Sequence, residues 1–100
     1  MIRGTTPTHI FTLPFDNSLI SKLRIIYAQG DRKVLVKEHH DCQIEGNMVT
    51  VKLSQLETFL FDCTKYVEIQ LRVLTKGGDA LNSRPMKVSV ERCLDTEVLA

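Results

Sequence analysis

The sequence has no tryptophan and only three cysteines, Cys42, Cys63 and Cys93, at wide spacing. None of them forms a C-x-x-C pair, so neither a zinc site of paired cysteines nor a redox motif is predicted. Reduced thiols are the expected state, although two of the three could form a disulfide if the fold brought them close enough. An antibody-type domain is excluded, because its buried disulfide and the tryptophan that packs on it are both missing.

Long apolar segments and an excess of charge are also missing. The chain carries 13 Lys and Arg against 12 Asp and Glu, a formal net charge of +1. Binding of nucleic acid depends mainly on clustered basic side chains, so no nucleic-acid partner is expected. No apolar run is long enough to cross a bilayer, and residues 1–7 lack the apolar centre of a signal peptide. We therefore expect no membrane contact and a protein that is made and kept in the cytosol unless another assembly carries it out.

Two runs of alternating side chains, residues 67–73 and 86–91, are the most informative feature that is present. In the first run every second residue is Val, Ile or Leu and the intervening residues are Glu, Gln and Arg; in the second, Met and Val alternate with Lys, Ser and Glu. A period of two is typical of a half-buried strand. Because a glycine turn at residues 76–79 separates the runs, they are predicted to be adjacent antiparallel strands.

Shorter apolar segments between turn residues predict five further strands. They cover residues 9–13, 22–28, 33–38, 42–44 and 48–53. About seven strands with almost no helical periodicity indicate an all-β fold, an antiparallel immunoglobulin-like β-sandwich, with a barrel as the alternative. The 100 residues, 43% of them hydrophobic and 25% charged, are of a size for one domain that covers residues 1–100.

A short helical turn is predicted after the strand at 48–53. Ser54 and Glu57 have the spacing of a capping box, in which each side chain bonds the other residue's backbone N–H. The turn contains Leu56, and Phe59 and Phe61 follow it. Since they are strongly apolar, at least two of them are expected to cover the end of the core.

No segment predicts a catalytic, metal or cofactor site. The only cluster of possible metal ligands is formed by His39, His40, Asp41 and Cys42. Neighbouring residues on an extended chain point to opposite sides, so these side chains could not easily bind one ion together. The same segment contains the residue types of a Cys-His-Asp triad, yet triads are assembled from separated positions and need an oxyanion hole. Gly77 and Gly78 lack the context of a phosphate-binding loop, so a turn is the better interpretation. No small-molecule substrate is expected.

The segment 93–100 is a candidate for partner binding. Leu94, Val98 and Leu99 have the spacing of a short amphipathic turn that could dock onto the domain or onto another chain. A disordered tail is the alternative for so short a segment. The exposed edges of a sheet offer another way to associate, by addition of a strand.

Several motifs resemble a known group of proteins. MIRGTTPTH at residues 1–9, LPFD at 13–16, IEGN at 44–47, VTVKL at 49–53 and IQLRVL at 69–74 are similar to small proteins encoded in bacterial prophages. They also resemble the N-terminal β-sandwich modules of phage baseplate and tail proteins. The resemblance implies a non-enzymatic structural protein of the tail or virion, present in the host cytoplasm during assembly and then in the particle. Its expected partners are other phage structural proteins and further copies of itself.

Two other functions remain open from the residues alone. A carbohydrate- or host-surface-binding module would need several exposed aromatic side chains around a shallow groove. A small metalloenzyme would need residues 39–42 to converge with His9, the only other histidine. The three hypotheses therefore differ in which side chains the fold must bring to one surface.

Overall fold

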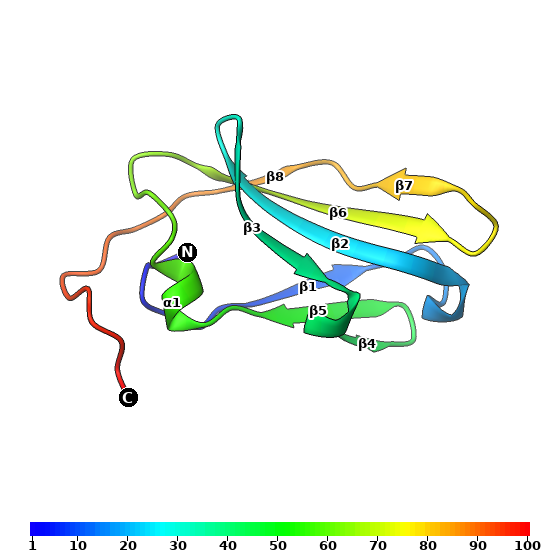
Figure 1. The fold of residues 1–100 in the computed structure, drawn as a ribbon, viewed down its shortest axis with the longest axis horizontal. Coiled ribbons are helices and arrows are strands. Elements are labelled where there is room, and N and C mark those ends of the chain that lie inside the picture. Colours follow the sequence, from blue (N-terminus) through cyan, green and yellow to red (C-terminus); the bar gives the residue numbers. More distant parts are fainter.

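The computed structural model describes residues 1–100 as two antiparallel β-sheets that face each other (Figure 1). This confirms the predicted all-β sandwich. The three-stranded sheet has the order β1 (Thr8–Thr12), β5 (Met48–Lys52), β4 (Gln43–Glu45). The five-stranded sheet has the order β3 (Arg32–Glu38), β2 (Ile20–Gln29), β6 (Val67–Thr75), β7 (Ala80–Asn82), with β8 (Met86–Val88) also paired to β6.

The chain folds into eight strands, because β7 lies between the two alternating runs. The predicted antiparallel pairing of these runs is confirmed, with Val67 opposite Val88. β7 uses the same edge of β6 further along, with Arg72 opposite Asn82. Between β7 and β8, the Ser83 hydroxyl accepts a hydrogen bond from the Leu71 amide at 2.9 Å. A three-residue strand has too few positions to show an alternation, which is why the sequence does not predict β7.

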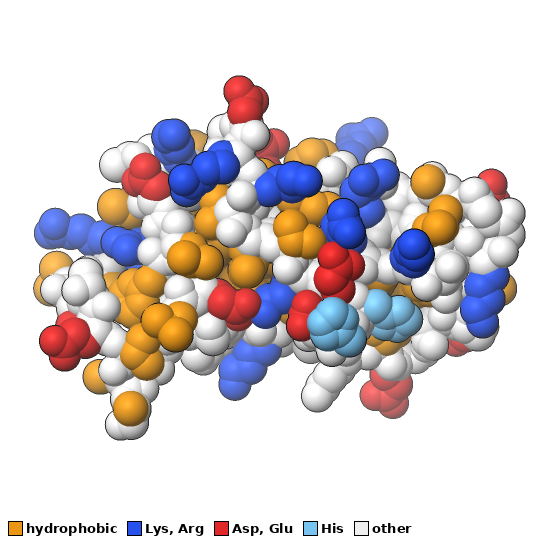
Figure 2. All heavy atoms as spheres, in the orientation of Figure 1, with side chains coloured by type: hydrophobic (Ala, Val, Ile, Leu, Met, Phe, Trp, Pro, Cys, Tyr) orange, Lys and Arg blue, Asp and Glu red, His pale blue; other side chains and the backbone are white.

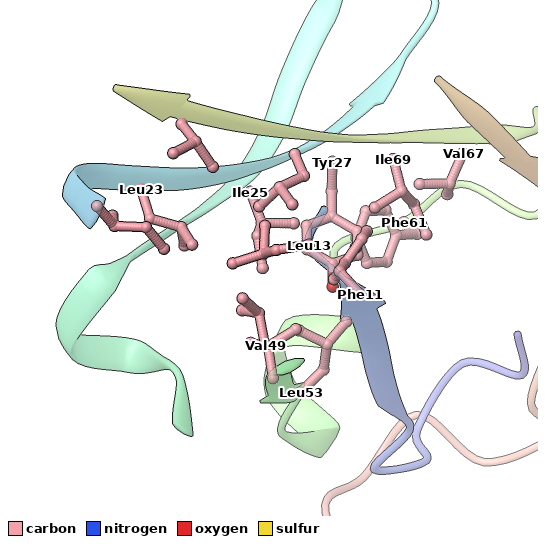
Figure 3. Packing of buried hydrophobic residues seen from close by; sticks show 14 of the residues in the cluster. Phe11, Leu13, Leu23, Ile25, Tyr27, Val49, Leu53, Phe61, Val67 and Ile69 are labelled. Atoms are coloured by element: carbon pink, nitrogen blue, oxygen red, sulfur yellow. The ribbon is translucent and has the colours of Figure 1, made fainter. Parts of the chain in front are cut away.

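The core lies between the two sheets and consists of alternate residues of the long strands (Figure 3). Leu23, Ile25 and Tyr27 of β2 are buried, as their alternation predicts. Facing them, Val49 and Val51 of β5 are buried, as is Leu53 directly after this strand. Fifteen hydrophobic side chains form this cluster, so the sandwich is stabilised by aliphatic and aromatic packing.

The predicted capping box is present at α1 (Gln55–Thr58). The Ser54 hydroxyl accepts a hydrogen bond from the Glu57 amide at 3.1 Å, and the Glu57 carboxylate accepts one from the Ser54 amide at 2.8 Å. Two 3₁₀ turns complete the helical content, η1 (Asn17–Leu19) and η2 (His39–Asp41). None of these helices has the length and apolar character needed to cross a membrane.

The three apolar residues around α1 have different environments. Phe61 is buried and Phe59 is partly covered, whereas Leu56 is 68% exposed. A helix of four residues turns only one side chain fully inward, and here that residue is Thr58. Its hydroxyl donates to the Thr5 carbonyl at 3.0 Å and accepts from the Gly4 amide at 2.9 Å. Leu56 therefore lies on the outer side of the helix and does not close the core.

Candidate functional site

The candidate partner-binding segment 93–100 starts where the two ends of the chain run side by side. Ile2 and Glu91 form a parallel β-bridge. The Arg3 amide donates to the Glu91 carbonyl at 3.0 Å, and the Glu91 amide donates to the Met1 carbonyl at 2.8 Å. Val90, next to this bridge, is buried in the core. The start of the segment is therefore fixed by backbone pairing and by packing.

A close approach at Gly4 connects this bridge with the end of α1. Gly4 has a φ of +81°, and a Cβ built on it would lie 2.8 Å from the Phe59 ring and 3.4 Å from the Cys93 sulfur. Both facts favour glycine at this position. The Arg3 guanidinium lies 5.6 Å from the centroid of the Phe59 ring and donates to the Phe59 carbonyl at 3.0 Å. These contacts fix the path of the chain into the tail.

The tail docks onto α1 through its backbone. The Gln55 amide nitrogen donates to the Leu99 carbonyl at 2.9 Å, and the Gln55 amide oxygen accepts from the Leu99 N–H at 2.8 Å. One side chain thus satisfies both backbone groups of a residue 44 positions away. Leu94 is 89% exposed and Leu99 is 77% exposed, so the predicted apolar residues face solvent rather than the domain.

Exposed apolar side chains gather at this end of the molecule (Figure 2). They come from α1, from the turn that follows it and from the tail. We call this group the end surface: Leu56, Leu60, Leu94, Val98 and Leu99. The sequence predicted the tail residues as candidates but not Leu56 and Leu60, because their exposure depends on which side of α1 faces the core.

The segment His39–Cys42 folds as a short 3₁₀ turn followed by a partly buried cysteine. His39, His40 and Asp41 form η2, and Cys42 donates its thiol hydrogen to the Glu38 carbonyl at 3.4 Å. Burial raises the pKa of this thiol, and the nearby Asp41 carboxylate raises it further. A thiol of raised pKa has little thiolate at neutral pH and is a weak nucleophile. No group of three or more possible metal ligands occurs in the chain, and all three cysteines are free thiols.

His9 has a different partner, the buried Tyr27. Its Nδ1 lies 2.7 Å from the Tyr27 hydroxyl, with the ring centroids 5.6 Å apart. Burial raises the pKa of Tyr27, so its hydroxyl stays protonated, and the tautomer of the imidazole decides which of the two groups donates. Burial, with a smaller effect of the N-terminal positive charge, lowers the pKa of His9 from its ordinary value of 6.5. The pair joins β1 of one sheet to β2 of the other.

This pair predicts that the protein is less stable in mild acid. As the pH falls below 6.5, the unfolded chain takes up a proton on His9 before the folded chain does, so the free energy of unfolding decreases. Urea denaturation at pH 7.5 and at pH 5 measures this decrease. His9→Gln should reduce it, whereas the double variant His39→Asn and His40→Asn should keep it. An equal decrease in His9→Gln and in the unmodified protein would contradict the prediction.

Two surfaces with distinct chemistry therefore result from the fold. The end surface is apolar and includes the three residues that the sequence predicted, and the outer face of the five-stranded sheet is charged. No known protein family, no curated protein and no solved structure matches this chain.

Proposed function

We propose that this protein is a non-enzymatic protein-interaction module that works as a structural component in the assembly of a phage tail or virion. The observation that carries the proposal is the end surface, five exposed Leu and Val side chains gathered at one end of the molecule. Exposed apolar patches on a folded protein mark sites of interaction with other proteins. The end surface is thus the contact with a neighbouring subunit.

The phage assignment is supported by the motifs that resemble prophage-encoded proteins. Residues 44–53 of this resemblance form the β4–β5 hairpin, and residues 69–74 lie in β6. The immunoglobulin-like type of the sandwich is part of the same proposal, and two facing antiparallel sheets with short connections support it. In this proposal the protein is present in the host cytoplasm during assembly and then in the particle.

A carbohydrate- or host-surface-binding module is the alternative, and the aromatic residues favour it less. Such a module stacks sugars on several exposed aromatic rings. Tyr66 is the one aromatic side chain among the strongly exposed large hydrophobic residues, and Tyr27, Phe11 and Phe61 are in the core. An apolar surface of leucine and valine suits a protein partner better than a sugar.

Deletion of the gene in a strain that produces the phage, followed by complementation, tests the proposal. We expect the deletion to arrest assembly and mass spectrometry to detect the complementing protein in purified particles. The triple variant Leu56→Ser, Leu60→Ser and Leu94→Ser should be incorporated about tenfold less, because these exposed side chains contribute to the contact and little to the fold. Ile10→Ser, on the exposed edge strand β1, is the matched control and should be incorporated normally. Infectious particles of normal composition without this protein would refute the proposal.

A further inference from the structure

A row of charged and polar side chains crosses the outer face of the five-stranded sheet. Arg24 of β2 and Arg72 of β6 are directly opposite each other. Arg24 is also opposite Glu38 of β3, with its Nε 3.2 Å from the carboxylate. On the other side, the Arg72 Nε donates to the Asn82 side-chain oxygen at 3.0 Å. Both guanidinium groups are thus oriented through Nε, and neither uses its terminal amino groups in a hydrogen bond to the protein.

This row forms the floor of a basic groove. The groove has a volume of about 270 Å³, and its polar lining is Lys22, Arg24, Arg72 and Glu38. Three cations and one carboxylate leave an excess of positive charge. Like charges directly opposite on a sheet destabilise it, so the Arg24–Arg72 pair is unfavourable unless an anion lies near both. Carboxylates pair with arginine through two parallel hydrogen bonds, and the groove is therefore suited to an acidic ligand.

The tail of the chain has the complementary character. Residues 93–100 include Asp95 and Glu97 and no Lys or Arg. In an extended segment, side chains two residues apart lie on the same face and about 6.6 Å apart. Asp95, Glu97 and Leu99 would then face the groove together, and the groove offers Leu74 and Ala80 as apolar lining next to its cations. In Figure 2 most of the visible Lys and Arg side chains lie over the five-stranded sheet.

The two elements lie apart in the structure. The tail leaves near α1, whereas the groove lies where β2 begins, β6 ends and β7 runs (Figure 1). In the structure the tail is held beside α1 by Gln55, so the acidic pair does not contact the groove of its own domain.

We propose that the acidic tail of one copy binds the Arg24–Arg72 groove of a second copy. This inference rests on the proposed function, and it specifies a partner for the module. Binding requires the tail to release Gln55 and to extend, which breaks the hydrogen bond from the Glu97 amide to the Asp95 carboxylate. Because the tail and the groove are different surfaces of the chain, the contact is head-to-tail. Repetition of such a contact gives a ring or a filament.

Sedimentation velocity of the full chain over a range of concentrations tests this proposal. We expect association that grows with concentration and weakens at high salt, because the contact is between exposed charges. Arg72→Glu should weaken the association about tenfold or more. The same change replaces a like-charge pair by an opposite-charge pair, so the fold should be retained, and thermal unfolding checks this. Lys52→Glu makes the same charge change on the exposed face of β5 and should leave association unchanged.

A peptide provides the second readout. An acetylated and amidated peptide of residues 93–100 should bind the full chain in a fluorescence anisotropy titration, and should not bind the Arg72→Glu variant. The peptide with Asp95→Asn and Glu97→Gln should bind about tenfold more weakly. A monomer at every concentration together with a peptide that does not bind overturns the inference, as does equal association of Arg72→Glu and Lys52→Glu.

The outcome also separates this inference from the proposed function. If Arg72→Glu enters phage particles normally while the variant of Leu56, Leu60 and Leu94 does not, the contact between copies is refuted and the end surface remains the site of assembly. If association depends on Arg72 but particles form normally without the protein, the head-to-tail contact stands and the role in the phage is refuted.

Discussion

Replacement of Phe61 by alanine is expected to lower the free energy of unfolding by about 3–5 kcal/mol. Phe61 is 1% exposed and lies between α1 and β6. Its ring packs against that of Tyr27, with centroids 5.9 Å apart and planes at 50°. Alanine would remove most of the buried apolar area and leave a cavity between the sheets, and both effects destabilise the folded state.

Leu60 supplies the matched control for this prediction. It is the preceding residue, but it is 53% exposed. Leu60→Ala should change the free energy of unfolding by less than about 0.5 kcal/mol. Urea denaturation followed by circular dichroism measures both variants. Domains of this size have a total free energy of unfolding of about 5–15 kcal/mol, so a loss of about 3–5 kcal/mol can unfold the protein. Phe61→Leu should therefore be measured as well, and its loss of stability should lie between those of Phe61→Ala and Leu60→Ala. Similar losses for Phe61→Ala and Leu60→Ala would show that Phe61 does not pack in the core.

The long strands could be predicted from the sequence because their signal is local. In β2 from Leu23 to Gln29 and in β6 from Val67 to Val73, buried residues alternate with less buried ones, and this pattern depends only on the geometry of an extended chain. The capping box at Ser54 and Glu57 is local in the same sense, since both partners lie within one turn. These local signals are sufficient to predict the fold class, because none of them depends on a contact between the sheets.

Other features depend on contacts between distant residues and left no signal in the sequence. Gln29 lies just outside the strand predicted at residues 22–28, but it is the last residue of β2 and is 4% exposed. The opposition of Arg24 and Arg72 depends on the register of two strands, which hydrophobic alternation restricts only to one face or the other. The docking of Leu99 on Gln55 joins residues that are 44 positions apart. The candidate tail residues could thus be predicted as apolar, but not their partner.

Gln29→Leu is expected to lower the free energy of unfolding by about 1–3 kcal/mol, because it leaves partly buried backbone groups without partners. The Gln29 amide nitrogen donates to the Asp62 carbonyl at 2.7 Å and to the Lys65 carbonyl at 3.2 Å. The Gln29 amide oxygen accepts from the Asp62 N–H at 2.9 Å. Leucine has a similar size but can make none of these bonds. Gln43→Leu, at an exposed position of β4, is the control and should cost less than about 0.5 kcal/mol.

The Gln29→Glu variant separates hydrogen bonding from packing. A glutamate keeps the shape and the acceptor for the Asp62 amide, but an ionised carboxylate oxygen would face the two carbonyl oxygens that the amide nitrogen contacts. This environment favours the protonated form and raises the pKa of the new carboxyl group above its unfolded value. The loss of stability should therefore be smaller in acid and should grow as the pH rises. A loss that does not change with pH, measured by urea denaturation against the Gln43→Leu control, would mean that the side chain acts through its shape alone.

The effects of Gln29 and Phe61 should not be additive, since both residues fix the connection between α1 and β6. Gln29 bonds the backbone of Asp62, the residue that follows Phe61. Loss of these bonds would let the connection move, so that part of the packing of Phe61 is already lost in Gln29→Leu. The double variant Gln29→Leu and Phe61→Leu should therefore be more stable than the sum of the single effects predicts, by about 0.5 kcal/mol or more. Strict additivity in urea denaturation would show that the two side chains stabilise the connection independently.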